Sequence, residues 1–429
     1  MRNATLNVYK VIIVLLVISY ILLSSPSVST NKISAGMTLF FSLLLLYRSR
    51  KNLPLLIVSI FIFYCNYSVI IGEYFVGGEL GTPMTQTKTV GIYGLTINIL
   101  LLFMVVLSLF IRSGKLEYSK IVIKPKNNSV IFYTLICGLM YIFIFGVNRT
   151  HFSSYEVSIT PMYEYSSLLF LLSYYVSGGL KVRKWIITLM CVAFILQDFY
   201  FGGRITSMQL IIFLSLTMIL KKLSFRRVIL GAFVGILLNT VVHVYRQSYS
   251  FSNVNLISIL EDLYNSYFVF NTPVFAYYSS STHVATSEVV GWHEKGISII
   301  EFIGSIFIGS ARNLGDVTDY SNRFFSNIGG GFIVTHFYFW LSWVGVVVAA
   351  TLIIFIVNRI GSGKNDYWKL ATICFIFSVP RWYLYTPLSM FRPLFLLFVL
   401  YIITQVVHHV LLKIAGVRKP QINVSVTSK

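Results

Sequence analysis

About twelve apolar runs, each long enough to cross a lipid bilayer, dominate this chain. Of its 429 residues, 56% are hydrophobic and only 11% are charged. These runs predict an all-α, polytopic integral membrane protein with about twelve transmembrane helices. The predicted spans are residues 8–24, 33–47, 53–72, 90–111, 129–147, 163–180, 185–201, 205–220, 228–244, 332–357, 370–386 and 393–412. Several are short for a span, so we expect tilting or flanking aromatic anchors.

The basic residues separate according to the side of the membrane on which the alternating connections place them. The connections on one side carry 24 basic and 2 acidic residues, and those on the other carry 10 basic and 12 acidic residues. Because basic residues in short loops stay cytoplasmic, the first side is predicted to be the inner one, and both termini lie there. The net charge of +20 therefore indicates topology and not nucleic-acid binding.

This topology divides the chain into four parts. Residues 1–244 hold nine spans with short loops, and residues 332–412 hold three more. Residues 245–331 form a large extracytoplasmic loop, and residues 413–429 form a basic cytoplasmic tail. The first 30 residues lack a convincing small-residue cleavage site, which favours an uncleaved first span over a signal peptide.

The extracytoplasmic loop is the expected location of chemistry. It has 87 residues and contains seven of the twelve outer-side acidic residues. Long ordered loops tend to be functional, although a plain connector is the alternative. Apolar residues recur at helical spacing over 255–270 and 297–309, which predicts two interfacial helices along the membrane surface.

Two short patterns resemble known motifs but lack their essential residues. The run from Gly361 to Lys364 resembles a phosphate-binding loop, but the earlier glycine and the Ser or Thr after the lysine are missing. His293 and Glu294 begin like a zinc-protease helix, but no second histidine follows. The four cysteines all fall inside predicted spans, where they act as small apolar residues. We therefore expect no metal ion, no nucleotide and no other cofactor.

Three outer-side arginines, Arg204, Arg381 and Arg392, lie at the ends of predicted spans. An arginine at membrane depth costs about 2.5–3.5 kcal/mol on insertion scales, so it usually faces a partner or a water-filled cavity. Arg204 follows two glycines that permit close backbone approach, and its planar guanidinium can bind a phosphate through two parallel hydrogen bonds. The alternative for Arg204 is interfacial snorkelling or pairing with Asp198. The alternative for Arg381 and Arg392 is a structural role.

Aromatic residues make up 16% of the chain. Most are expected to form interfacial belts and to pack between helices. A few are predicted to lie on the outer side and are candidates for stacking on sugar rings: Trp292, Tyr338, Trp340 and Trp382.

A series of motifs follows in order between about residues 190 and 350. The turn Gly202-Gly203-Arg204 opens a span, and the long loop follows two spans later. Within the loop, the run from Gly291 to Gly296 (GWHEKG) precedes an Ile- and Phe-rich helix. Gly329-Gly330-Gly331 then leads into a span that contains YFWLSWVG from Tyr338 to Gly345. This order resembles that of the Wzy-type O-antigen and capsular polysaccharide polymerases.

The resemblance implies a fold, an activity and partners. The fold would be GT-C-like, in the cytoplasmic (inner) membrane of a bacterium. Such polymerases join undecaprenyl-diphosphate-linked oligosaccharide repeat units at the outer leaflet, and they move the growing chain from its lipid diphosphate onto the incoming unit. The implied partners are this lipid-linked oligosaccharide, membrane lipids, and a chain-length regulator and flippase of the same pathway.

Cleavage of a sugar–diphosphate bond requires stabilisation of an anionic leaving group and a base for the acceptor hydroxyl. The candidate diphosphate-binding residues are Arg204, Arg246, Arg312, Arg323 and Arg381. The candidate bases are His283, His293, Glu294 and Asp262, and the candidate sugar-binding residues are Trp292 and Tyr338. Some family members carry paired Arg-x10-Gly loops, but no arginine here has a glycine eleven residues later. A mechanism built on those repeats is therefore not transferred.

Three other functions remain as alternatives. An O-antigen ligase shares the predicted topology and the diphosphate chemistry. A flippase or secondary transporter would have two related halves, short loops and charges at the bilayer midplane, which the asymmetric late loop disfavours. A sugar O-acyltransferase would require a catalytic histidine in a span, and His243 and His336 lie near span ends.

Overall fold

The computed structural model describes residues 2–76, 86–112, 123–147, 160–201, 203–219, 224–248, 255–268, 271–308, 315–360 and 365–414. Within these ranges the chain is helical and has no β-strand. Among the described residues, six helices are long and apolar enough to cross a membrane, namely Val28–Ser49, Leu53–Phe75, Val90–Phe110, Phe225–Val242, Ile333–Arg359 and Leu388–Leu411. The protein is thus an all-α membrane protein, as the apolar runs predict.

Helices lie over the nine segments that are predicted as spans in the first part of the chain, and among the described residues four of these helices are long and apolar enough to cross a membrane. The helices of this part are α1 (Arg2–Leu23), α2 (Val28–Ser49), α3 (Leu53–Val69), the π-helix η1 (Ile70–Phe75), α4 (Val90–Phe110), α5 (Ser129–Phe145), α6 (Pro161–Glu164), α7 (Ser166–Val176), α8 (Lys181–Tyr200), α9 (Ile205–Leu214), the π-helix η3 (Ser215–Ile219) and α10 (Phe225–Ser248). The helices over the predicted spans 53–72 and 205–220 both finish in a π-helical turn.

The later helices are α11 (Leu256–Phe268), α12 (Thr272–Val289), α13 (Trp292–Ile308), α14 (Val317–Ser321), α15 (Ile333–Ile360), α16 (Asp366–Phe377), α17 (Val379–Leu384) and α18 (Leu388–Ile414). α15 is bent at Ser342, which has a left-handed φ of 53°. The predicted span at 370–386 is divided into α16 and α17. Helix α17 has a proline in its first turn. Pro residues start helices readily because their missing N–H would be unpaired there.

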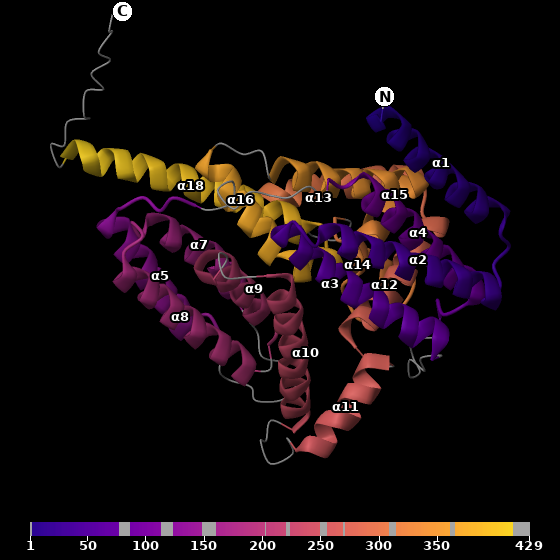
Figure 1. Ribbon diagram of the computed structural model, residues 1–429, viewed down its shortest axis with the longest axis horizontal. Coiled ribbons are helices and arrows are strands. Elements are labelled where there is room, and N and C mark those ends of the chain that lie inside the picture. The colour runs from indigo at the N-terminus through magenta and orange to yellow at the C-terminus, as the bar shows by residue number, and fades with distance from the viewer. Residues whose placement is uncertain are drawn as a thin grey trace, which may run out of the picture.

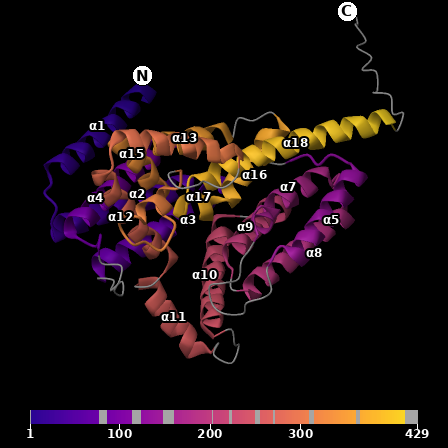
Figure 2. The same ribbon diagram turned by 180° about the vertical axis from the view of Figure 1, so that it is seen from behind.

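Helix α4 lies at the centre of one group of helices (Figures 1 and 2). It contacts α1, α2, α12 and α15, and its residues from Ile99 to Leu109 are all buried. A helix that is apolar on all sides is stable in a protein core or in a membrane, and α4 lies in the core of this group. In both views α5, α7, α8 and α9 form a second group, and α16 and α18 connect the two.

Buried polar side chains join neighbouring helices of the first group. The hydroxyl of Ser34 in α2 donates to Asn98 Oδ1 in α4 at 2.6 Å. Asn66 in α3 donates through Nδ2 to Ser42 in α2 at 2.9 Å, and its Oδ1 accepts from the Tyr383 hydroxyl in α17 at 2.8 Å. Small hydroxyl and amide residues allow close helix contact in an apolar medium, so these bonds fix the relative positions of the four helices.

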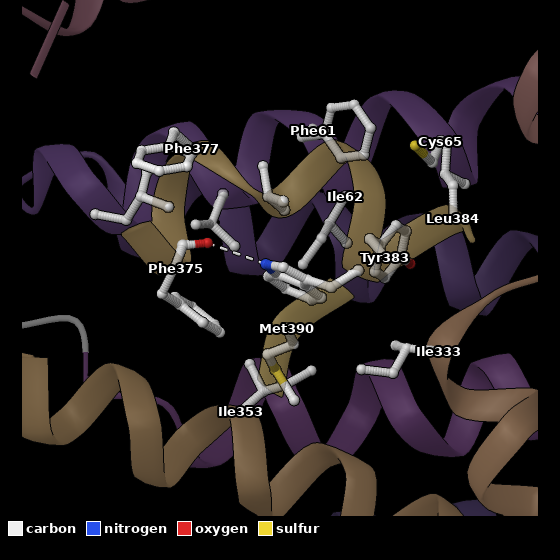
Figure 3. Close-up of a cluster of buried hydrophobic side chains, with 14 of the residues drawn as sticks. Phe61, Ile62, Cys65, Ile333, Ile353, Phe375, Phe377, Tyr383, Leu384 and Met390 are labelled. Atoms are coloured by element: carbon white, nitrogen blue, oxygen red, sulfur yellow. Dashed lines mark hydrogen bonds between the residues drawn. The ribbon is translucent and has the colours of Figure 1, made fainter. Parts of the chain in front are cut away.

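Helix α17 is anchored by Trp382, whose side chain is fully buried. Its Nε1 donates to the Phe375 carbonyl at 3.0 Å, shown as the dashed line in Figure 3. Phe61, Ile353 and Met390 are among the side chains in this cluster (Figure 3), and they come from α3, α15 and α18. Trp382 is thus packed in the protein core and is not available to stack on a sugar.

Arginine Arg48, at the end of α2, closes the carboxyl end of α4. Its guanidinium donates to the carbonyls of Ser108, Leu109 and Ile111, the last two at 3.0 and 3.1 Å. The last carbonyls of a helix have no partner within the helix, and they carry partial negative charge. The sequence identifies Arg48 only as a topology signal, but this residue also holds α2 and α4 together.

Where the structure describes it, the segment predicted as a large loop contains four helices, α11 to α14. Helices were expected over 255–270 and 297–309, and α11 and α13 lie there. Helix α12 was not predicted, and it is largely buried against α3, α4 and α15. Part of the loop thus lies inside the helical bundle.

We expect Arg48→Ala to destabilise the protein by about 1–3 kcal/mol, because three helix-terminal carbonyls lose a charged donor. The midpoint of unfolding of the purified protein in detergent measures this change. Arg50→Ala is the matched control, since Arg50 is exposed and its guanidinium stacks on Tyr47 at 4.0 Å. An equal loss from Arg50→Ala would contradict the assigned role of Arg48.

Candidate functional site

Helix α12 is polar but buried, and its hydroxyl groups bond to its own backbone. Asn271 caps its start by accepting from the Val274 amide at 2.9 Å. The hydroxyls that donate to preceding carbonyls, at 2.6 to 2.8 Å, are those of Ser280, Ser281, Thr282 and Thr286. Hydrogen bonds of this kind give each serine or threonine hydroxyl an acceptor without the help of a neighbouring helix. It makes a polar helix compatible with an apolar interior.

Three glycines place the chain directly against α12 before α15 begins. Gly329, Gly330 and Gly331 all have positive φ angles, of 88°, 74° and 156°. The Gly329 carbonyl accepts from Ser279 at 3.0 Å, and the Phe332 amide donates to Ser280 at 2.7 Å. A Cβ at Gly331 would lie 2.3 Å from His283 Cε1, so only glycine fits there. This explains the Gly-Gly-Gly run by packing and backbone conformation.

Histidine His283, a predicted base, is completely buried beneath these glycines. Its Nδ1 lies 3.2 Å from the Thr335 hydroxyl, which itself donates to the Phe332 carbonyl at 2.9 Å. The Thr335 hydroxyl therefore accepts from Nδ1–H, which leaves a lone pair on Nε2. Among the described residues Nε2 has no hydrogen-bond partner.

A second histidine lies against the first. The ring centroids of His283 and His336 are 4.5 Å apart, and His336 Nε2 donates to the Tyr385 carbonyl at 3.1 Å. Burial disfavours the charged imidazolium, and with His336 nearby it lowers the pKa of His283 well below its ordinary value. His283 is therefore neutral at neutral pH.

The carboxyl end of α12 is held by α13 and α15. The Tyr338 hydroxyl donates to Glu288 Oε1 at 3.1 Å, and Lys295 Nζ donates to the Ser287 carbonyl at 2.7 Å. Lys295 also lies over the ring of Trp292, 4.9 Å from its centroid. Tyr338 is buried, whereas Trp292 is exposed and has a face available for stacking. Trp340 is also buried, with Nε1 donating to Ser298 at 3.0 Å.

A cluster of charged and polar residues, here called the arginine corner, lies where α6, α8, α9 and α17 meet. It consists of Glu164, Asp198, Ser207 and Arg381, together with Arg204, which belongs to it through the turn that begins at Asp198. Arg381 Nη1 and Glu164 Oε2 form an ion pair at 2.8 Å. The buried Asp198 carboxylate accepts from the amide and hydroxyl of Ser207, at 2.8 and 2.7 Å, and it interacts electrostatically with Arg381 and Glu164.

Gly203, directly before Arg204, allows the tight turn between α8 and α9. The Gly203 amide donates to the Asp198 carbonyl at 2.8 Å, and a Cβ at Gly203 would lie 2.2 Å from Asp198 Oδ1. The close approach inferred from the Gly202-Gly203-Arg204 motif thus exists at Gly203, and it is made to Asp198. Gly202 lies outside the described residues.

The other predicted residues do not join these clusters in the described structure. His293 and Glu294 are exposed in the first turn of α13, where Glu294 accepts from the Gly291 amide at 3.1 Å. Arg323 is exposed and lies over the Tyr320 ring. Arg392 donates through Nε to the Ser305 carbonyl at 3.1 Å and so joins α18 to α13.

Three candidates cannot be placed at the level of side chains. Arg246 and Asp262 belong to α10 and α11, but their side chains lie outside the described structure. Arg312 lies outside the described residues altogether.

A polar cluster that sequence reasoning missed lies at the end of α3. Glu73 in η1 has a fully buried side chain and pairs with Lys88 at 3.4 Å. The rings of Tyr74, Tyr93 and Tyr277 surround this region, with centroids 5.4 to 6.3 Å apart. The available signal was an acidic residue directly at the end of an apolar run.

Comparisons of the chain with protein-family models, curated proteins and solved structures return no match. Within the part of the chain that the structure describes, no three His, Cys, Asp or Glu residues are grouped to hold a metal ion. The functional argument therefore proceeds from the polar clusters themselves.

We expect Gly331→Ala to lower stability by about 1–3 kcal/mol, because the new methyl group would overlap the His283 ring. Thermal unfolding of the purified protein measures this effect. Gly296→Ala is the control, since nothing lies within 4 Å of its added Cβ and alanine favours a helix. A Gly331→Ala variant as stable as the unmodified protein would show that the segment is not tightly packed on His283.

Proposed function

We propose that this protein is a polymerase that joins lipid-diphosphate-linked oligosaccharide units at the outer face of a bacterial cytoplasmic membrane. The arginine corner is the proposed site for the diphosphate of the donor. The proposed architecture has about twelve spans, cytoplasmic termini and a GT-C-like arrangement. The motif order between about residues 190 and 350 supports the family assignment.

The observation that carries the proposal is that Arg381 and the turn directly before Arg204 both lie beside Asp198. Arg204 directly precedes α9, Arg381 lies in α17, and these two helices are in contact. The Arg381 side chain is 21% exposed, and its buried Nε has no hydrogen-bond partner among the described residues. A guanidinium can stabilise the charge that develops on a leaving diphosphate.

The proposed reaction is a displacement at the anomeric carbon, so it needs no oxidant or reductant. The bond between the anomeric carbon and the diphosphate oxygen breaks, and the acceptor hydroxyl oxygen forms the new glycosidic bond. The leaving group departs as a lipid diphosphate anion, and a base takes the hydroxyl proton. Of the candidate bases, His283 carries an unshared lone pair but is buried, whereas His293 and Glu294 are exposed.

The contacts between helix ends support the proposed topology. Predicted inner ends meet where Lys126 pairs with Asp366 at 3.8 Å, and where the Arg112 amide donates to Asn358 at 3.2 Å. Predicted outer ends meet at the arginine corner, and also where Asn31 donates to the Val90 carbonyl at 2.9 Å. Each of these contacts joins ends that the charge distribution assigns to the same side.

A labelling experiment tests the orientation. In a cysteine-free background, we expect Asn322→Cys to react with a membrane-impermeant maleimide in cells whose outer envelope is permeabilised. We expect Arg226→Cys to react only after the inner membrane is opened. Both positions are exposed in the structure. The reverse pattern would invert the topology and remove the arginine corner from the outer face.

The arginine corner is tested by complementing a gene deletion and separating the surface polysaccharide on a gel. We expect Arg204→Ala and Arg381→Gln each to reduce polymerisation about 10- to 100-fold and to leave glycan with a single repeat unit, because each removes a charged hydrogen bond. Arg226→Gln is the control, because this arginine is exposed and assigned to the inner side.

The gel also separates the alternatives. Full-length polymer from both arginine variants, at normal protein level, would exclude the assigned role. In the deletion strain, polymer stranded on the lipid carrier would indicate a ligase, and repeat units trapped inside the cell would indicate a flippase.

A further inference from the structure

Helix α13 carries polar side chains on its inner face and apolar side chains on its outer face. The polar side chains that are buried against the protein are those of Lys295, Ser298 and Ser305. The side chains that point away from the protein are apolar and 50–91% exposed, namely Ile300, Ile303, Phe307 and Ile308. A helix on the surface of a water-soluble protein has the opposite arrangement, with its apolar stripe toward the core. The outer face of α13 is therefore poorly suited to water.

The inner face of α13 forms hydrogen bonds with neighbouring helices. Trp340 Nε1 in α15 donates to the Ser298 hydroxyl at 3.0 Å, and Arg392 Nε in α18 donates to the Ser305 carbonyl at 3.1 Å. The Ser305 hydroxyl itself donates to the Glu301 carbonyl at 2.7 Å. Polar groups that are paired within the protein do not need water, so this face of the helix can lie at membrane depth.

The outer face of α13 is apolar without interruption after its first turn. Within residues 295–308, every exposed side chain is apolar. A helix that lies on the membrane surface keeps a polar face toward water. Helix α11 has this arrangement, because Glu261 is exposed as well as Leu260 and Tyr264. Helix α13 therefore differs from a helix at the membrane surface.

The apolar face of α13 continues onto a neighbouring helix that can cross the membrane. Helix α13 contacts α15 and α18, which lie beside it in Figures 1 and 2. The rings of Phe307 and of Phe395 in α18 have centroids 4.9 Å apart. Helix α18 is long and apolar enough to span a membrane, and its Phe398 and Ile402 side chains are exposed. Exposed apolar side chains of a span contact lipid, so the stripe on α13 extends a lipid-facing surface.

The length of α13 favours entry into one leaflet. Its apolar part, residues 295–308, is about 21 Å long at ~1.5 Å per residue, whereas a bilayer core measures about 30 Å. The first turn is different, because Trp292, His293 and Glu294 are exposed there. Tryptophan is enriched at the boundary between membrane and water. The first turn thus marks the end of α13 that meets the polar layer.

We propose that α13 is embedded in one leaflet of the membrane, with Ile300, Ile303 and Phe307 against lipid acyl chains and the first turn among the headgroups. The helix thereby separates the contacts of Trp340 and Arg392 from lipid. The embedding of α13 does not depend on the proposed function, and only its assignment to the outer leaflet rests on the proposed topology. Part of the segment predicted as an extracytoplasmic loop is thus a membrane element.

The test places a fluorophore on the outer face of α13 in a lipid bilayer. In a cysteine-free background, Ile300→Cys, Ile303→Cys and Phe307→Cys are each labelled with bimane in detergent, and the full-length protein is transferred to phosphatidylcholine nanodiscs. The two quenchers are lipid with a nitroxide on its acyl chain and aqueous iodide. We expect the nitroxide lipid to remove most of the fluorescence at all three positions and iodide to leave it unchanged, because ions are excluded from the hydrocarbon region.

Two control positions calibrate the quenchers. Ile403→Cys lies on the exposed face of α18, and we expect it to respond as the α13 positions do. Asn322→Cys is exposed directly after α14, in the same predicted loop, and we expect iodide to quench it and the nitroxide lipid to have little effect. An unfolding midpoint equal to that of the cysteine-free protein shows that a label has not disturbed the fold.

Three results would overturn the proposal. Iodide quenching of the α13 positions as strong as that of Asn322→Cys would make α13 a helix of an aqueous loop. Equal quenching by both reagents would place it on the membrane surface, and protection from both would show that protein covers this face. None of these results bears on polymer formation by the Arg204 and Arg381 variants, so the two proposals fail separately.

Discussion

The structure depends on one constraint, which is that a polar group inside an apolar bundle must find its hydrogen-bond partner within the protein. Helix α12 meets this constraint by returning its serine and threonine hydroxyls to its own carbonyls. The Gly329–Gly331 segment then packs on α12 and forms hydrogen bonds with it. The constraint is not met everywhere in the described structure, and the exceptions include His283 Nε2 and Arg381 Nε, which belong to the two candidate clusters.

The apolar runs predict most helices correctly because each run must be helical to satisfy its backbone in the membrane. The same reasoning misses α12, since a segment rich in serine, threonine and tyrosine has the composition of an exposed loop. Its burial depends on local back-bonding and on glycines about fifty residues later, and neither appears in a hydropathy pattern.

The sequence predicts the kind of interaction that a site residue makes better than it predicts the partner. The need of Arg381 for an anionic neighbour is readable from its position, and the structure supplies Glu164. The sequence does not show that the turn of Arg204 lies in the same corner, because that contact depends on how α9 packs against α17. Tyr338 and Trp340 were assigned to sugar stacking on position alone, and they are buried in contacts with Glu288 and Ser298. The partners of Glu73 likewise depend on the wider turn of a π-helix.

Helix α17 is only six residues long, and its two ends serve different clusters. Arg381 near its start belongs to the arginine corner, while the carbonyl of Leu384 at its end accepts from the Gly331 amide at 2.8 Å. The next carbonyl, that of Tyr385, accepts from His336. The position of Arg381 and the position of the chain over His283 are thus fixed by one short helix. Any substitution that shifts α17 would disturb the charged cluster and the buried histidines together.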